Sequence, residues 1–296
     1  MRRKRIAAIG AAVVLPVLIL VWVLFIRGNA PRPIVYIALG DSIAQGYALD
    51  NPEQEGYAGL FAGMIQDADT DRVAKTANLA AAGLTTDQLL DQLTSPGIMT
   101  DELESATLIT LSIGGNNVLV PTISLVQDFL EGFLGVNIDD ITNINDILTL
   151  SPYGVLELVG MLPEFSFTEQ EVALLLSGTD DFARDFPEII SIIKSTAPDA
   201  EIIVSTIYNP IPAEIPLLRE QADEVISRMN AVITASAAEF GYKVADVYTA
   251  FNEAEYSVVN MNINPFAGDF SYDIHPNTEG HALIAQIHYE LLEEAK

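Results

Sequence analysis

The chain has 296 residues, half of them hydrophobic, and no cysteine. This composition permits a large buried core and excludes disulfides, thiolate nucleophiles and cysteine-based metal sites. Of the 14 basic residues, six lie in residues 1–32, which hold no acidic residue; residues 33–296 carry the other 8 and all 41 acidic side chains, a formal net charge of −33. Such a domain repels phosphate backbones, so we expect no nucleic-acid partner.

A hydrophobic segment without charges runs from residue 6 to residue 26, between a basic stub (residues 1–5) and Arg27. A helix of this length measures about 30 Å, the thickness of the hydrocarbon core of a bilayer. The excess of basic residues before the segment predicts an amino terminus inside the cell. We therefore expect a cytoplasmic stub (1–5), a transmembrane signal-anchor helix (6–26), a linker (27–33) and an extracytoplasmic domain (34–296). A cleaved signal peptide, which would leave a secreted protein, is the alternative, although Ala30-Pro31 is a poor cleavage context.

From residue 34 onward, short β-branched runs alternate with amphipathic stretches. This alternation predicts an α/β fold in which helices cover both faces of a parallel sheet. In such sheets the functional site lies at the carboxyl ends of the strands. The predicted strands are residues 34–39, 73–78, 107–112, 201–207 and 243–247, and the predicted helices are residues 57–66, 86–93, 182–195, 222–240 and 278–294.

One apolar stretch, residues 118–180, interrupts the alternation. It is too long for an ordinary connection, which indicates a helical insertion. Two interpretations stay open: additional scaffold packing, or a lid or acyl-pocket wall for a hydrophobic ligand.

Polar residues follow the predicted strands. Gly40-Asp41-Ser42 comes directly after the first strand. A serine at a strand-to-helix turn can present its hydroxyl and aim its own backbone N–H at a developing oxyanion. The tripeptide also suits an ordinary turn or helix cap, so it is a weak signal alone.

Three further clusters strengthen that signal. Gly83 follows the second strand, Gly114-Gly115-Asn116-Asn117 follows the third, and Asp273-Ile274-His275-Pro276 precedes the last predicted helix. A glycine allows a backbone N–H to approach a ligand closely. Three of the four clusters follow successive strands and the fourth precedes the last helix, so we expect all four to converge on one edge of the sheet.

These four blocks resemble the SGNH (GDSL) hydrolase superfamily, and the resemblance covers essentially all of residues 34–296. It implies a flavodoxin-like three-layer α/β/α sandwich of about five parallel strands. It also implies a serine ester hydrolase that needs no metal or organic cofactor. Ser42 would be the nucleophile and His275 the general base, while the Ser42 and Gly83 N–H groups and the Asn116 amide would form the oxyanion hole.

Two positions depart from the family's pattern. Asn117 stands where an aspartate is common; because an amide still accepts a hydrogen bond, we expect a structural effect only. The acidic partner of the histidine often lies three positions before it, where this chain has Tyr272. Asp273, two positions before His275, is the candidate here for orienting the imidazole.

The sequence leaves three functions in competition. The first is a lipase or esterase acting on small acyl esters or lipids at the outer face of the membrane. The second is a deacetylase of cell-wall or extracellular polysaccharide, and the third is a non-catalytic adhesion or scaffold domain. Other polar residues have plainer interpretations: we expect surface or packing roles for His281 and His288, and a solvent-exposed face or helix-end charge for Asp180-Asp181.

Overall fold

The computed structural model describes residues 33–68, 73–118, 166–262, 271 and 273–293. The predicted membrane span at residues 6–26 and most of the predicted insertion, residues 119–165, lie outside these ranges. Among the helices within them, none combines the length and the apolar character needed to cross a bilayer.

A five-stranded parallel sheet runs through residues 34–245 with the strand order β2-β1-β3-β4-β5. This confirms the predicted parallel α/β architecture and its number of strands. The order places β1 beside β3 at the point where the chain changes direction across the sheet, and ligands of flavodoxin-like folds bind at such a point. The strands are β1 (Ile34–Gly40), β2 (Val73–Asn78), β3 (Leu108–Ser112), β4 (Glu201–Ser205) and β5 (Lys243–Ala245).

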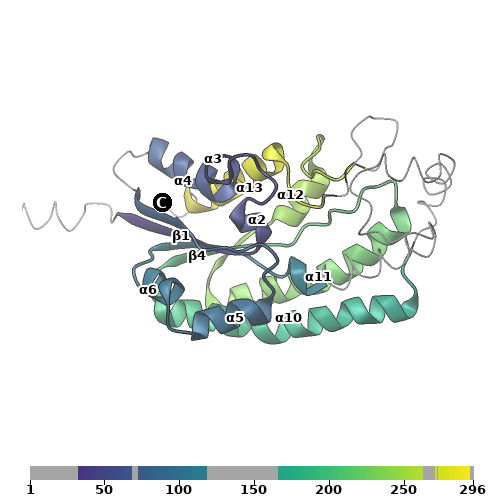
Figure 1. The fold of residues 1–296 in the computed structure, drawn as a ribbon, viewed down its shortest axis with the longest axis horizontal. Coiled ribbons are helices and arrows are strands. Elements are labelled where there is room, and N and C mark those ends of the chain that lie inside the picture. Colours follow the sequence, from purple (N-terminus) through teal and green to yellow (C-terminus); the bar gives the residue numbers. More distant parts are fainter. Residues whose placement is uncertain (1–32, 69–72, 119–165, 263–270, 272, 294–296) are drawn as a thin grey trace, which may run out of the picture. The chain divides into compact units, whose positions relative to one another are not determined.

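Helices cover both faces of the sheet (Figure 1). On one face lie α2 (Ser42–Gln45), α3 (Pro52–Glu55), α4 (Tyr57–Ala68), α12 (Val247–Glu253) and α13 (Thr278–Glu293). On the other face lie α5 (Thr86–Thr94), α6 (Ile98–Leu103), α10 (Glu169–Thr196) and α11 (Pro216–Phe240). The three-layer sandwich is therefore present.

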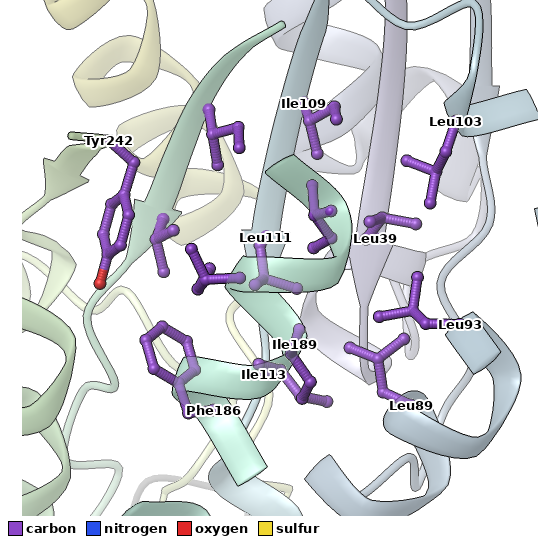
Figure 2. Close-up of a cluster of buried hydrophobic side chains, with 14 of the residues drawn as sticks. Leu39, Leu89, Leu93, Leu103, Ile109, Leu111, Ile113, Phe186, Ile189 and Tyr242 are labelled. Carbon is purple, nitrogen blue, oxygen red and sulfur yellow. The ribbon is translucent and has the colours of Figure 1, made fainter. Parts of the chain in front are cut away.

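Alternation along the strands explains this layering. In β1, Ile37 and Leu39 face one core, while Tyr36 and Ala38 face the other. Successive side chains of a strand point to opposite faces, so a strand buried on both sides is apolar throughout. Figure 2 shows the first core, where leucines and isoleucines of the sheet and of α5 meet Phe186 and Ile189 of α10.

Two predicted strands are too long. The fourth ends at Ser205 and the fifth at Ala245. Asp246 then begins α12, because its side chain accepts a hydrogen bond from Thr249 N–H (3.2 Å). This helix and the short helices α2, α3 and α6 are not among the helices predicted from the sequence.

The helix predicted at residues 182–195 begins much earlier, at Glu169. Thr168 and Glu171 form a capping box there, with the Thr168 Oγ1 accepting from Glu171 N–H (3.3 Å). Residues 169–180, predicted as part of an insertion, thus belong to α10. Leu175 packs there in a small separate core with Leu218 of α11, which favours scaffold packing for this part of the segment.

Candidate active site

Ser42 is the first residue of α2, directly behind the carboxyl end of β1. The turn that delivers it needs glycine at position 40, because φ is +130° and a Cβ there would lie 1.9 Å from Ser112 O. Asp41 N–H donates to the same Ser112 oxygen (3.0 Å), and the Asp41 carboxylate caps the helix by accepting from Ile43 N–H (3.1 Å). The Ser42 N–H therefore begins a helix and has no intrahelical acceptor.

The Asp41 carboxyl is buried immediately beside the predicted nucleophile, with 3% of the residue exposed. Burial raises its pKa to about 7, and the hydrogen bond from Ile43 N–H opposes that shift. The sequence analysis considered the tripeptide as a possible helix cap, and the structure shows that Asp41 has this role.

Gly83 lies on a segment that returns along the end of β1, where Ala81 N–H donates to Gly40 O (3.0 Å). It has a positive φ of +78°, and a Cβ built on it would meet no atom within 4 Å. The backbone at this point can therefore be approached closely by a ligand.

Asn116 follows β3 and is almost buried, with 6% exposed. One N–H of its side-chain amide donates to Leu84 O (3.0 Å), which holds the amide beside the Gly83 segment. Because a carboxamide has two N–H groups, the second is left to serve as a donor to another group. The structure thus places the Asn116 amide against Leu84, the residue that follows Gly83.

Asn117 fixes the same segment from the other side. Its Oδ1 accepts from Thr86 N–H (3.1 Å) at the start of α5, and its Nδ2 donates to Thr86 Oγ1 (2.7 Å). The amide at position 117 therefore does accept a hydrogen bond, and the expectation that the change from aspartate leaves activity intact stays a prediction.

His275 and Asp273 form a close pair. His275 Nδ1 lies 2.5 Å from Asp273 Oδ1, and the same carboxylate oxygen accepts from the His275 backbone N–H (3.1 Å). The imidazole side chain is 14% exposed and the carboxylate 30%. The contact at Nδ1 leaves Nε2 as the imidazole nitrogen available for proton transfer. A spacing of two residues therefore suffices to pair these side chains.

Tyr47 connects this pair to the serine segment. Its backbone N–H donates to Ser42 O (3.0 Å), and its ring packs against the His275 imidazole with 4.8 Å between centroids. Within the ranges that the structure describes, the Ser42 hydroxyl and the His275 imidazole are not hydrogen-bonded to each other. Such bonds are often long without substrate and tighten when it binds.

The other two histidines are fully buried packing residues, as expected. His281 Nδ1 accepts from Tyr57 N–H (3.2 Å), and His288 Nδ1 contacts Ile284 O (2.8 Å). Asp180 and Asp181 are exposed, also as expected. No group of three or more His, Asp or Glu side chains in the described part of the chain is arranged to hold a metal ion.

Two residues at the site escaped the sequence analysis. Tyr47 carries no signal beyond its place shortly after Ser42, and Asn260 lies in a loop with no motif. Asn260 Nδ2 donates to Asp273 Oδ2 (2.9 Å), a contact that only the folded chain reveals.

This chain is similar to several known proteins. It is 24% identical over 262 residues to the uncharacterized protein YpmR of Bacillus subtilis strain 168, covering 88% of this chain and 82% of that protein. The lipase Lip_vut3 from a goat rumen metagenome has a similar fold, with a TM-score of 0.59, 19% identity, and coverage of 87% of this chain and 96% of that one.

An extracellular lipase from Streptomyces rimosus is also similar, with a TM-score of 0.55, 16% identity, and coverage of 89% of this chain and 100% of that one. At these identities the two structures show a shared fold. The profile of GDSL-like lipases and acylhydrolases matches residues 38–283, most of the chain. The chain therefore belongs to the GDSL-like Lipase/Acylhydrolase family.

Proposed function

We propose that this protein is a serine ester hydrolase in which Ser42 attacks the ester and His275 acts as general base. The observation that carries the proposal is the Asp273–His275 pair, with 2.5 Å between Oδ1 and Nδ1. The His275 ring packs on Tyr47, whose backbone N–H donates to Ser42 O. A carboxylate at Nδ1 fixes the tautomer that accepts a proton at Nε2, and it stabilises the imidazolium that forms.

In the acylation step, His275 Nε2 takes the Ser42 proton as the serine oxygen bonds to the ester carbonyl carbon. The carbonyl oxygen becomes an oxyanion, which the N–H groups of Ser42 and Gly83 and the second N–H of Asn116 stabilise. Each such donor contributes about 3 kcal/mol to the transition state. His275 then gives its proton to the leaving alcohol, and the acyl group remains on Ser42.

In the deacylation step, His275 takes a proton from water as the water oxygen attacks the acyl carbon. The second tetrahedral intermediate collapses, the carboxylic acid leaves, and the proton returns to Ser42. The alcohol is no longer present at this stage, so its identity affects acylation alone. This distinction allows the two halves of the substrate to be studied separately.

Short acyl esters are the proposed substrate class, and the family's description as lipases and acylhydrolases supports the ester linkage. A polysaccharide deacetylase is the second candidate. The observation that favours it is Tyr47, a tyrosine 52% exposed and packed on His275, because exposed aromatic rings stack on sugars. We further propose that the enzyme acts outside the cytoplasm; the apolar segment at residues 6–26 is the support for this placement.

Replacing Ser42 by alanine tests the proposal. The purified wild type should hydrolyse p-nitrophenyl acetate and react with a fluorophosphonate probe, whereas S42A should do neither. Hydrolysis that survives in S42A would refute the nucleophile, and a wild type that neither reacts with the probe nor turns over would indicate a non-catalytic domain. Comparing acetyl, butyryl and octanoyl esters with acetylated oligosaccharides then separates the two substrate classes.

A further inference from the structure

The Asp273–His275 pair lies near the end of the loop between α12 and α13, and Asn260, near the start of the same loop, contacts it. Asn260 reaches the pair twice: its Nδ2 donates to Asp273 Oδ2 (2.9 Å), and its backbone N–H donates to His275 O (2.9 Å). Two isolated antiparallel bridges, Val259 with Pro276 and Asn262 with Ser271, align the two segments on either side of these contacts.

Because Asp273 and His275 are only two residues apart, the contact made by the second carboxylate oxygen of Asp273 matters for the orientation of the carboxylate. Asp273 Oδ1 already serves both the backbone N–H and the Nδ1 of His275, so both of those contacts fall on a single carboxylate oxygen. The carboxylate is 30% exposed, and Oδ2 would otherwise face water. Rotation about the Cβ–Cγ bond of an aspartate meets a low barrier, so a contact at Oδ1 alone leaves the carboxylate plane poorly fixed. The bond from Asn260 fixes that plane.

We propose that Asn260 is a positioning residue that holds the Asp273 carboxylate in the plane in which it orients His275. This inference rests on the proposed function, because it assigns a role within that catalytic site. Asn260 acts through Asp273 and does not touch the substrate. Its amide suits the role because an N–H donor stabilises a carboxylate without adding charge.

Two buried titratable side chains lie beside this contact. Tyr208 faces the pair and donates its hydroxyl to Ile274 O (2.8 Å), and its pKa is raised well above the ordinary value by burial. His281 also faces His275, and burial lowers its pKa to about 4. Both groups stay neutral between pH 6 and pH 9, whereas Asp41 beside Ser42, with a pKa of about 7, changes charge in that interval. Asp41 is unchanged in the variants, so the difference between the pH profile of each variant and that of the wild type reports on the substitution at Asn260.

Two substitutions test the proposal, N260A and N260D. N260A removes the donor, and we expect kcat for p-nitrophenyl acetate to fall about tenfold with KM changed less than threefold. N260D keeps the shape of the side chain but places a second carboxylate against Asp273. Adjacent negative charges favour the protonated imidazole, so the acidic limb of the kcat/KM profile should move to higher pH in N260D and the rate at pH 7 should fall further than in N260A.

The matched control is S257A. Ser257 lies in the same loop and its hydroxyl donates to Val259 O (2.9 Å), three residues before Asn260 in the chain. This substitution loosens the loop without touching Asp273, so kcat/KM should stay within threefold of the wild type and the pH profile should not move. Thermal unfolding of all the variants shows whether each one folds.

The outcomes separate the inference from the proposed function. A wild type without Ser42-dependent hydrolysis would overturn the proposed function. If the wild type is active, and folded N260A and N260D keep its kcat and its pH profile, the positioning role is overturned while the proposed function stands. A fall in kcat equal in S257A and N260A, with no movement of the acidic limb in N260D, would assign Asn260 to loop packing and also overturn the inference.

Discussion

The ring of Tyr47 packs against the imidazole of His275, with 4.8 Å between the ring centroids and 48° between the ring planes. Tyr47 is also 52% exposed, so the part of its ring that does not meet His275 is accessible to a ligand. In the proposed mechanism His275 delivers a proton to the leaving alcohol, so a side chain packed on the imidazole lies on the alcohol side of the ester. Tyr47 is therefore placed to influence which alcohols are accepted.

Replacing Tyr47 by alanine should change acylation according to the alcohol. We expect kcat/KM to fall about tenfold for acetate esters of aromatic alcohols and sugars, which stack on the ring, and less than threefold for ethyl acetate. Hydrolysis of the common acetyl-enzyme, measured after a pre-steady-state burst, should remain unchanged.

Two variants control this prediction. Y47F keeps the ring and should retain the wild-type preference. Y256A removes another tyrosine that is 54% exposed, and in the described residues this ring makes no aromatic contact with His275. An equal loss of rate for every alcohol in Y47A would contradict a role in substrate choice.

Much of this architecture follows from short-range patterns in the sequence. Short apolar, β-branched runs such as residues 34–39 predicted the parallel sheet, and the polar residues Ser42 and Asn116 follow the carboxyl ends of β1 and β3. The strand ends were less predictable, since Val247 is β-branched yet begins a helix after the cap at Asp246. In that case the capping hydrogen bond prevailed over the intrinsic preference for strand.

The long-range contacts at the site could not be predicted from the residues that neighbour each partner in the sequence. Asn260 reaches Asp273 across thirteen residues, and an asparagine in a loop looks the same in the sequence whether or not it has such a partner. The start of α10 was missed for a different reason. The helical periodicity of residues 169–180 merges with the long apolar stretch before it, so the capping box at Thr168 was the only boundary mark.

Substitutions of Asn117 test whether the stability of the protein depends on the hydrogen-bond acceptor that this side chain supplies to the start of α5. Its Oδ1 satisfies Thr86 N–H in the first turn of α5, where backbone N–H groups lack intrahelical partners. N117A should lower the free energy of unfolding by about 1–3 kcal/mol, because it leaves that donor without an acceptor. N117D keeps an acceptor and places a negative charge at a helix amino terminus, so its stability should lie within about 1 kcal/mol of the wild type. Urea unfolding checks both values, and equal losses in the two variants would contradict the acceptor role.

The buried Asp41 carboxyl should make the fold more stable as the pH falls. Its pKa is about 7 in the folded chain against an ordinary value of 3.8, so the folded state holds a proton that the unfolded chain releases. This contribution is complete below pH 3.8 and is lost as the pH rises through 7. The shift corresponds to about 4 kcal/mol at most. D41N keeps a capping oxygen for Ile43 N–H and does not titrate, so the contribution should be absent from its stability profile between pH 4 and pH 8.

Buried His281 and His288 should make the fold less stable as the pH falls. Both pKa values are lowered by burial from 6.5 to about 4, and the contacts require neutral rings, since His281 Nδ1 accepts from Tyr57 N–H. As the pH falls, these histidines therefore become protonated in the unfolded chain before they do so in the folded chain. The stability that they contribute is fully present above pH 6.5 and is lost as the pH falls through 4. Each shift corresponds to about 3 kcal/mol. Two histidines outweigh one aspartate, so the wild type should lose stability between pH 6.5 and pH 4.

Comparing two variants separates these opposing contributions. H288Q should be less stable than the wild type at pH 7, because it disturbs packing against Tyr57 and Phe61, but its loss of stability between pH 6.5 and pH 4 should be smaller. D41N lacks the contribution that opposes the histidines, so its loss over the same interval should be larger. Guanidinium unfolding at pH 7.0, 5.5 and 4.5 measures the three slopes. Identical slopes in the wild type, H288Q and D41N would mean that neither buried group titrates differently in the folded and unfolded chains.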